Sequence, residues 1–369
     1  MNYSDEKWVL MLMFYLAMAI ALFFAMNIGA SGTAASMGAA YGSDAIRKRP
    51  AMILVSIGAL LGAVLGGGEV VKTISGGIIP SSILDVNLVL IILASATSTL
   101  FIANLIGIPL STSEVTVGAI VGVGIAYQEL YFQKLLYIVS FWILVPITAF
   151  IMAYILNKGV QKLEKRWPEL KGKGKWKKWL SLLLILTGFY EAFSAGMNNV
   201  ANAVGPLVGA GLISPTLSVW VGGIFVALGA LLLGGRVLET NGKKITSLSL
   251  LQGSTVSLTG GTLVVIASIF GIPVPLTQAT TCAILGVGTS DHGFRLWQKG
   301  VIKKIIKVWI VSPVSSLVVS FVLVHIALKP DPYIITVIVS VLIATIGGIS
   351  LSQAIRRENS TFNDQGGGI

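Results

Sequence analysis

FAMNIGASGTAASMGAAYG, residues 24–42, is a run rich in Gly, Ala and Ser inside a longer apolar stretch. The same pattern returns 167 residues later as AFSAGMNNVANAVGPLVG, residues 192–209. Side chains this small let another backbone or a small ligand approach the chain closely. The recurrence indicates two related halves, each with a segment suited to such an approach.

Two further blocks repeat in the same order. GGEVVKT (67–73) matches GGRVLET (234–240), again 167 residues later. GIPLSTSEVTVGAIVGVG (107–124) matches GIPVPLTQATTCAILGVG (271–288) at a spacing of 164 residues. Blocks in one order at nearly one spacing predict an internal repeat.

The composition is that of a membrane protein. The chain has 369 residues, of which 54% are hydrophobic and only 11% charged, less than half the charge of an average soluble domain. The single cysteine excludes an internal disulfide, and no Cys or His cluster predicts a metal site, so we expect no cofactor. We predict an all-α polytopic membrane protein, with apolar runs of spanning length at 8–26, 51–65, 86–105, 131–156, 216–233, 305–328 and 333–349.

The basic residues predict the topology. Most of them lie in five groups, of which the largest is the segment 157–178. A single membrane topology places all five groups in the cytoplasm. In this topology the N-terminus lies outside the cell membrane and the C-terminus inside. The net charge of +11 is therefore a topology signal rather than a sign of nucleic-acid binding.

Equivalent loops of the two halves differ in charge. Loop 43–50 is basic, whereas its equivalent 210–217 has no charge, so the two loops are expected on opposite sides of the membrane. This predicts an inverted-topology repeat. We expect an N-terminal repeat at 8–156, a basic cytoplasmic linker at 157–178, an inverted C-terminal repeat at 179–328, and a final helix with a polar tail at 329–369.

Two kinds of element are candidates for a substrate site. The small residues of segments 27–38 and 194–205 permit either close helix packing or a broken helix, and their polar residues at membrane depth favour a broken, functional segment. The blocks around LSTSE (110–114) and VPLTQ (274–278) are expected to be tips of re-entrant helical hairpins, with arms near 88–107/112–126 and 250–271/276–289. Each tip would present a helix N-terminus, where free N–H groups and the helix dipole favour an anion.

These blocks resemble the inorganic phosphate transporter (PiT) family, across roughly residues 20–125 and 185–290. The family motif is close to Gly-Ala-Asn-Asp-Val-Ala-Asn-Ala, followed by Pro-Val-Ser-Thr-Thr-His, in each half. Here the second half keeps GMNNVANAVGP (196–206), and the hairpin blocks read PLSTSE and PVPLTQ. The resemblance implies an oxyanion symporter with its substrate between hairpin tips and broken helices.

The departures from the family motif bear on the substrate. Gly32 and Asn199 stand at the family's aspartate positions, and Glu114 and Gln278 at its histidine positions. Sulfate has no proton to donate at neutral pH and would be repelled by an ionised carboxylate, so losing both aspartates favours sulfate over phosphate. The first block, GGEVVKTISGGIIP and the first hairpin are most similar to the sulfate permease type within the family.

The sequence therefore predicts a secondary transporter that imports sulfate, with phosphate as the alternative substrate. The driving ion is expected to be a proton, because a protonated Glu114 could donate a hydrogen bond to sulfate, or else sodium. An anion channel and an enzyme are less favoured: His292 and His325 are read as ordinary surface or structural histidines. A homodimer is compatible with the sequence.

The expected substrate-binding residues are Ser31, Gly32, Ser111, Thr112, Ser113, Asn198, Asn199, Thr277 and Gln278, and the candidates for the coupling ion are Glu114, Glu191 and Asn27.

Overall fold

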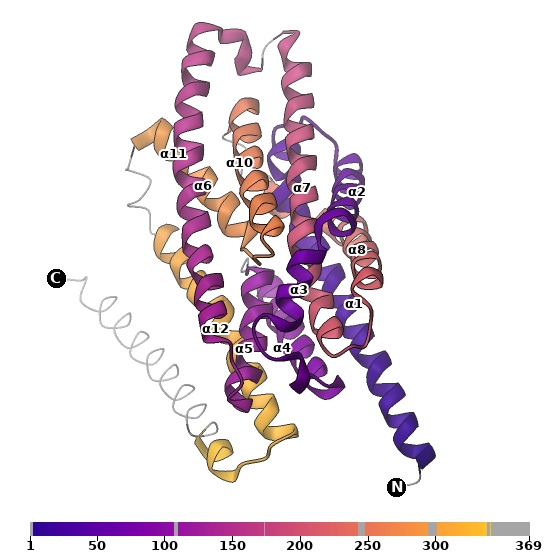
Figure 1. Cartoon of the computed structure of the whole chain (residues 1–369). Helices are drawn as coiled ribbons and strands as arrows, with labels where there is room; N and C mark the ends of the chain where they lie inside the picture. Colours follow the sequence, from indigo (N-terminus) through magenta and orange to yellow (C-terminus); the bar gives the residue numbers. More distant parts are fainter. Residues whose placement is uncertain are drawn as a thin grey trace, which may run out of the picture. The chain divides into compact units, whose positions relative to one another are not determined.

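A computed structural model describes residues 3–106, 110–172, 174–242, 248–293, 301–337 and 340. Every regular element within these ranges is a helix (Figure 1). Eight of the helices are long and apolar enough to cross a membrane, which agrees with the predicted class. The helices are α1 (Tyr3–Gly42), α2 (Lys48–Gly66), α3 (Gly68–Gly76), α4 (Val86–Ile106), α5 (Thr112–Tyr127), α6 (Phe132–Arg166), α7 (Trp176–Gly209), α8 (Pro215–Leu232), α9 (Gly234–Gly242), α10 (Leu250–Ile269), α11 (Leu276–His292) and α12 (Val301–Ala327), with 3₁₀ turns at Ser81–Ile83 and Pro168–Lys171.

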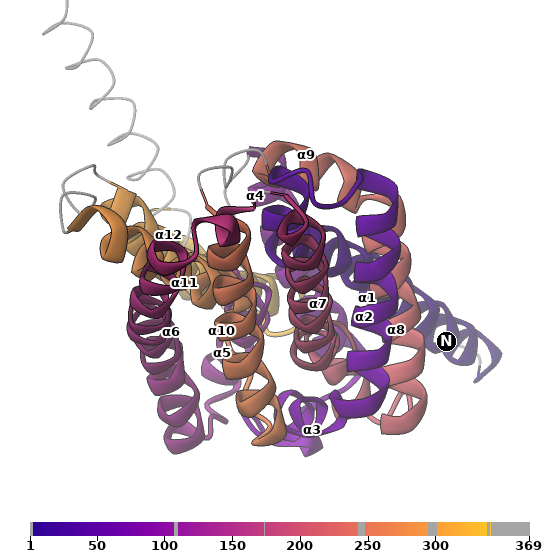
Figure 2. The ribbon, with the colours of Figure 1, turned by 90° about the horizontal axis from the view of Figure 1, so that it is seen from above.

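The order of long and short helices in α1–α6 returns in α7–α12. Each half has a long first helix, a spanning helix, a short helix, a helical pair and a final long helix. The halves also exchange partners, since α2 packs on α7 and α8 packs on α1 (Figure 2). This order fits the predicted repeat, whereas its inversion across a membrane stays a prediction.

The expected breaks in the small-residue segments are absent. Helix α1 is continuous through 27–38, and α7 is continuous through 194–205. Side chains reinforce the first of these turns: Thr33 Oγ1 donates to the Gly29 carbonyl at 3.0 Å, and Ser36 Oγ donates to the Gly32 carbonyl at 3.1 Å. The prediction of broken helices was therefore wrong for this structure.

Close helix packing explains several of the small residues instead. A Cβ atom at Gly29 would lie 1.9 Å from the Val226 carbonyl oxygen of α8. One at Gly196 would lie 1.9 Å from the Ala59 carbonyl oxygen of α2. Only glycine lets these backbones approach so closely, and the same approach recurs at equivalent places in both halves.

Both predicted hairpin helix pairs are present, as α4 with α5 and α10 with α11. In Figure 1, α10 and α11 come down from the upper half while α4 and α5 rise from the lower half, so their tips meet in the middle. Helix α12 supports the first hairpin, because Ser316 Oγ donates to the Val115 carbonyl at 2.6 Å. The re-entrant course of the hairpins in a membrane stays a prediction.

The basic segment 157–178 is less of a linker than expected, because α6 continues to Arg166. The chain up to Ser320 forms one compact unit, and Phe321 begins a second. In that second unit the rings of His325 and Phe321 pack in a tilted arrangement, with centres 4.5 Å apart. The predicted final span at 333–349 lies mostly outside the described residues.

Candidate functional site

A small cavity lies where the two hairpin tips meet α1 and α7. We call it the tip cavity. Its volume is about 10 Å³, room for about one water molecule. Six of the predicted binding residues line it, together with Ala35, Leu110 and Leu276. The six are Ser31, Gly32, Ser111, Thr112, Asn199 and Thr277.

Two helix N-termini open on the tip cavity. Ser111 caps α5, because its hydroxyl oxygen accepts a bond from the Glu114 backbone N–H at 3.4 Å. That acceptor role leaves the hydroxyl hydrogen of Ser111 to be donated elsewhere. Pro275 precedes α11 and makes no side-chain cap. Both termini therefore turn positive dipole ends toward the cavity, an arrangement that favours an anion.

Hydrogen bonds join the first tip to α7. Thr112 Oγ1 donates to Asn199 Oδ1 at 3.2 Å. Asn202 Nδ2 donates to Thr112 Oγ1 at 3.3 Å and to Ser113 Oγ at 3.2 Å. Ser113 thus lies behind the cavity wall, within the network that orients Thr112 and Asn199.

Asn198 holds the second tip. Its side-chain amide donates to the Ile272 carbonyl and to Ser268 Oγ, each at 2.9 Å. Its carbonyl oxygen accepts a bond from the Val274 backbone N–H at 3.1 Å. Ser113 Oγ also donates to the Val274 carbonyl at 3.2 Å, and this bond joins the first tip to the second. Asn198 therefore holds the second tip and does not line the tip cavity, and its predicted contact with the substrate stays a prediction.

Glu114 and Gln278 contact each other and do not line the tip cavity. Gln278 Nε2 donates to Glu114 Oε1, and both side chains are buried. Glu114 Oε2 and Gln278 Oε1 have no partner among the described residues. These two residues also border an apolar cavity of about 430 Å³ between α5, α6, α11 and α12. Since Glu114 and Gln278 are equivalent positions of the two halves, the two tips contact each other through equivalent residues.

The other two candidates for the coupling ion lie apart from the cavity. Glu191 is completely buried in α7, and its carboxylate accepts a bond from Thr280 Oγ1 of α11 at 2.6 Å. Its Oε2 atom has no partner within the described part of the chain. Asn27 donates to the Phe23 carbonyl of its own helix at 2.9 Å.

Three contributors to the site were missing from the expected set. Asn202 binds the first tip, Ser268 binds Asn198, and Ser312 Oγ donates to the Ser111 carbonyl at 3.5 Å. Asn202 could have been found by its spacing of one helical turn from Asn199. Ser312 begins a row of serines, followed by Ser316 and Ser320, that repeats every four residues in an apolar helix.

The tip cavity is neutral and polar. None of its described lining residues is ionisable, and hydroxyls, an amide and helix N-termini supply the donors. A tetrahedral oxyanion is larger than the space present. Binding one therefore requires some of the elements that line the cavity, the two tips, α1 and α7, to move.

Comparison with known proteins identifies the family. The phosphate transporter family model matches residues 28–320. Sulfate permease CysP of Bacillus subtilis is 55% identical over 96% of this chain and 99% of its own. A solved structure of a sodium-dependent phosphate transporter is 26% identical, with a TM-score of 0.75 over 85% of this chain and 99% of that one. The matched proteins are transporters rather than enzymes, and with eight apolar helices this chain is a multi-pass membrane protein. The protein belongs to the phosphate transporter family.

Proposed function

We propose that this protein imports sulfate by secondary active transport, with the anion bound between the two hairpin tips. The observation that carries the proposal is the convergence of two helix N-termini and several hydroxyls on one neutral cavity. Such donors stabilise an anion without a basic residue. The name of the Bacillus subtilis relative supports the same substrate.

The chemistry of the lining favours sulfate over phosphate. Hydrogen phosphate carries a proton that a carboxylate can accept, whereas sulfate at neutral pH carries none. Gly32 and Asn199 offer no carboxylate to the cavity. The site therefore suits an anion that only accepts hydrogen bonds. Phosphate remains the second candidate, because the family and its solved relative are named for phosphate.

A proton is the coupling ion that we propose, with Glu114 as its carrier. Glu114 does not face the tip cavity, so the coupling acts through the contact between the tips. A protonated carboxyl can share a hydrogen bond with Gln278 and leave the pair neutral beside a bound anion. An ionised carboxylate would repel the anion across the short distance to the cavity. Glu191 is the second candidate, because it is buried against the second hairpin, which carries Gln278, through its bond with Thr280.

Competition in reconstituted vesicles tests the substrate. Labelled sulfate uptake is measured with an inward proton gradient and rising concentrations of unlabelled sulfate or phosphate. We expect unlabelled sulfate to compete at concentrations at least about tenfold lower than phosphate, since each hydrogen bond to a charged group contributes about 1.5–3 kcal/mol. Equal competition by phosphate would overturn the argument from the missing carboxylates. Downhill flux that never saturates would indicate a channel.

A further inference from the structure

A third and larger cavity lies on the far side of the second hairpin tip. We call it the vestibule. Its volume is about 530 Å³, and it lies between α3, the first turns of α6 and the residues that follow α10. Polar and charged side chains dominate one wall. Those of α3 and its following turn are Glu69, Lys72, Thr73, Ser75 and Ser81, and α6 adds Lys134 and Tyr137.

The vestibule adjoins the hydrogen-bond network that holds the second hairpin tip. Gly271 and Ile272 line the vestibule, and the Ile272 carbonyl accepts the bond from Asn198. Gly271 has a φ of +68°, and a Cβ atom there would lie 3.0 Å from the Glu69 carbonyl oxygen. The backbone of the second tip therefore separates the vestibule from the network behind the tip cavity. A movement of that tip would connect the two spaces.

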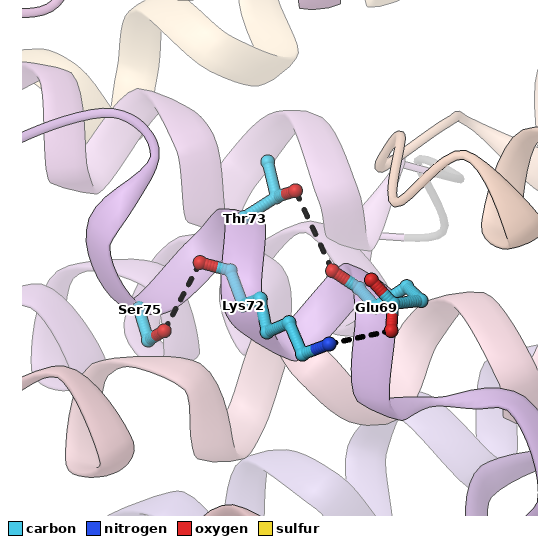
Figure 3. A network of polar contacts seen from close by, with 4 residues as sticks. All are labelled: Glu69, Lys72, Thr73 and Ser75. Carbon is cyan, nitrogen blue, oxygen red and sulfur yellow. Dashed lines mark hydrogen bonds and ion pairs between the residues drawn. The ribbon is translucent and has the colours of Figure 1, made fainter.

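The charges in the vestibule favour an anion. Lys72 Nζ and Glu69 Oε1 form an ion pair at 2.6 Å, one helical turn apart on α3 (Figure 3). Both side chains are more than half exposed, so the pair is weak and can be replaced by another partner. Lys134 Nζ lies 5.0 Å from the centre of the Tyr131 ring. The charged residues that line the vestibule are thus two lysines and one carboxylate, which leaves one positive charge in excess.

Figure 3 also shows how α3 holds these groups. Thr73 Oγ1 donates to the Glu69 carbonyl at 3.5 Å, and Ser75 Oγ donates to the Lys72 carbonyl at 3.1 Å. Ser81 Oγ donates to the Ser75 carbonyl at 3.4 Å, which ties the following turn back to the helix end. Hydrogen bonds from its own hydroxyl groups therefore stabilise the part of α3 that carries Lys72.

We propose that the vestibule is a first docking site for the transported oxyanion, in which Lys72 and Lys134 bind it before it passes the second tip. Glu69 competes with the anion for Lys72 and keeps the site weak enough to release it. The proposal rests on the proposed function for the identity of the anion and on the predicted topology, which places these residues on the outer side. Charged clefts raise the local concentration of an oppositely charged ligand.

Charge variants in proteoliposomes test the docking site. Lys72→Met and Lys134→Met should each raise the KM for sulfate about two- to fivefold with little change in kcat, since an exposed ion pair contributes about that much. Glu69→Gln should lower the KM, because it frees Lys72. The differences should shrink as potassium chloride is added. Lys72→Arg should keep the wild-type KM.

Lys7→Met is the matched control, because Lys7 is also basic and is predicted on the outer side, at the exposed start of α1. It should leave the KM unchanged. Unchanged KM values in both vestibule lysine variants would overturn the proposal. So would an equal rise with Lys7→Met, which would indicate a general surface effect, or a raised KM with Glu69→Gln, which would indicate a structural ion pair.

The experiments distinguish a failure of the proposed function from a failure of the docking-site proposal. If the wild-type vesicles carry phosphate in place of sulfate, the proposed substrate is wrong, and the same variants then test the vestibule through the KM for phosphate. If sulfate is transported and the lysine variants keep the wild-type KM, the docking-site proposal is wrong and the proposed function stands.

Discussion

At the scale of single residues, Gly32 and Asn199 determine the charge of the tip cavity. Both line it, and both stand where the family motif has an aspartate. A Cβ atom at Gly32 would meet no atom within 4 Å, so a side chain can be added there without displacing the backbone. Asn199 Oδ1 already accepts bonds from Thr112 and Asn202, so the amide of Asn199 is held in place by the first tip and by its own helix.

Gly32→Asp should therefore weaken sulfate uptake sharply. An ionised carboxylate near the bound dianion should raise the KM about tenfold or more. Gly32→Asn is the matched control, because its side chain has nearly the same size without the charge. It should raise the KM much less. Equal KM values for the two variants would mean that space rather than charge limits this position. Labelled uptake over a range of sulfate concentrations gives both values.

At the scale of elements, the contact of the two hairpin tips is the feature most suited to coupling. Helices α5 and α11 meet through Glu114 and Gln278, which are 164 residues apart and equivalent in the two halves. The same tips carry the cavity residues Thr112 and Thr277. Under the proposed coupling, a change in the protonation of Glu114 acts on this contact between the tips.

Exchanging the two tip residues tests this coupling. Wild-type uptake should be faster at acidic external pH and should lose accumulation when a protonophore is added. Glu114→Gln should keep sulfate exchange but lose the pH dependence, and adding Gln278→Glu should restore it, because the carboxyl returns to the same contact. If Glu191→Gln alone abolishes the dependence, the proton is carried by Glu191. Uptake that requires sodium and ignores pH would exclude proton coupling.

At the scale of the whole molecule, the orientation in the membrane decides which cavity faces the outside. The predicted topology puts the vestibule outside and the basic segment around Lys171 inside. Equivalent residues contact each other at the tips, and α2 and α8 each pack on the first helix of the other half, whereas the inversion of the halves stays a prediction. Opposite orientation of equivalent loops is the property that remains to be measured.

Cysteine labelling measures the side of the membrane on which each loop lies. Cys282 is buried and is replaced by alanine to give a background without cysteine. Single cysteines at the exposed positions Arg47, Glu129 and Lys171 are then treated with an impermeant maleimide in intact cells and after permeabilisation. Position 129 should react in intact cells, and positions 47 and 171 only after permeabilisation. Reaction of positions 47 and 129 from the same side would exclude the predicted topology.

The sequence alone determined the class, the repeat and the polar elements of the site. Apolar length identified the helices, because each must satisfy its backbone within a membrane. Repeated blocks identified the hairpin tips that line the cavity, because Pro and Ser or Thr suit a helix N-terminus.

Only the tertiary structure decided which of these residues meet. Glycine permits both a helix break and close packing, and the neighbouring backbones of α2 and α8 select packing at Gly196 and Gly29. Asn198 and Asn199 are adjacent in sequence, yet the helical rotation between them directs one to the backbone of the second tip and the other to the cavity. Glu114 pairs with Gln278 rather than facing the cavity, because the two halves bring their equivalent positions together across one interface.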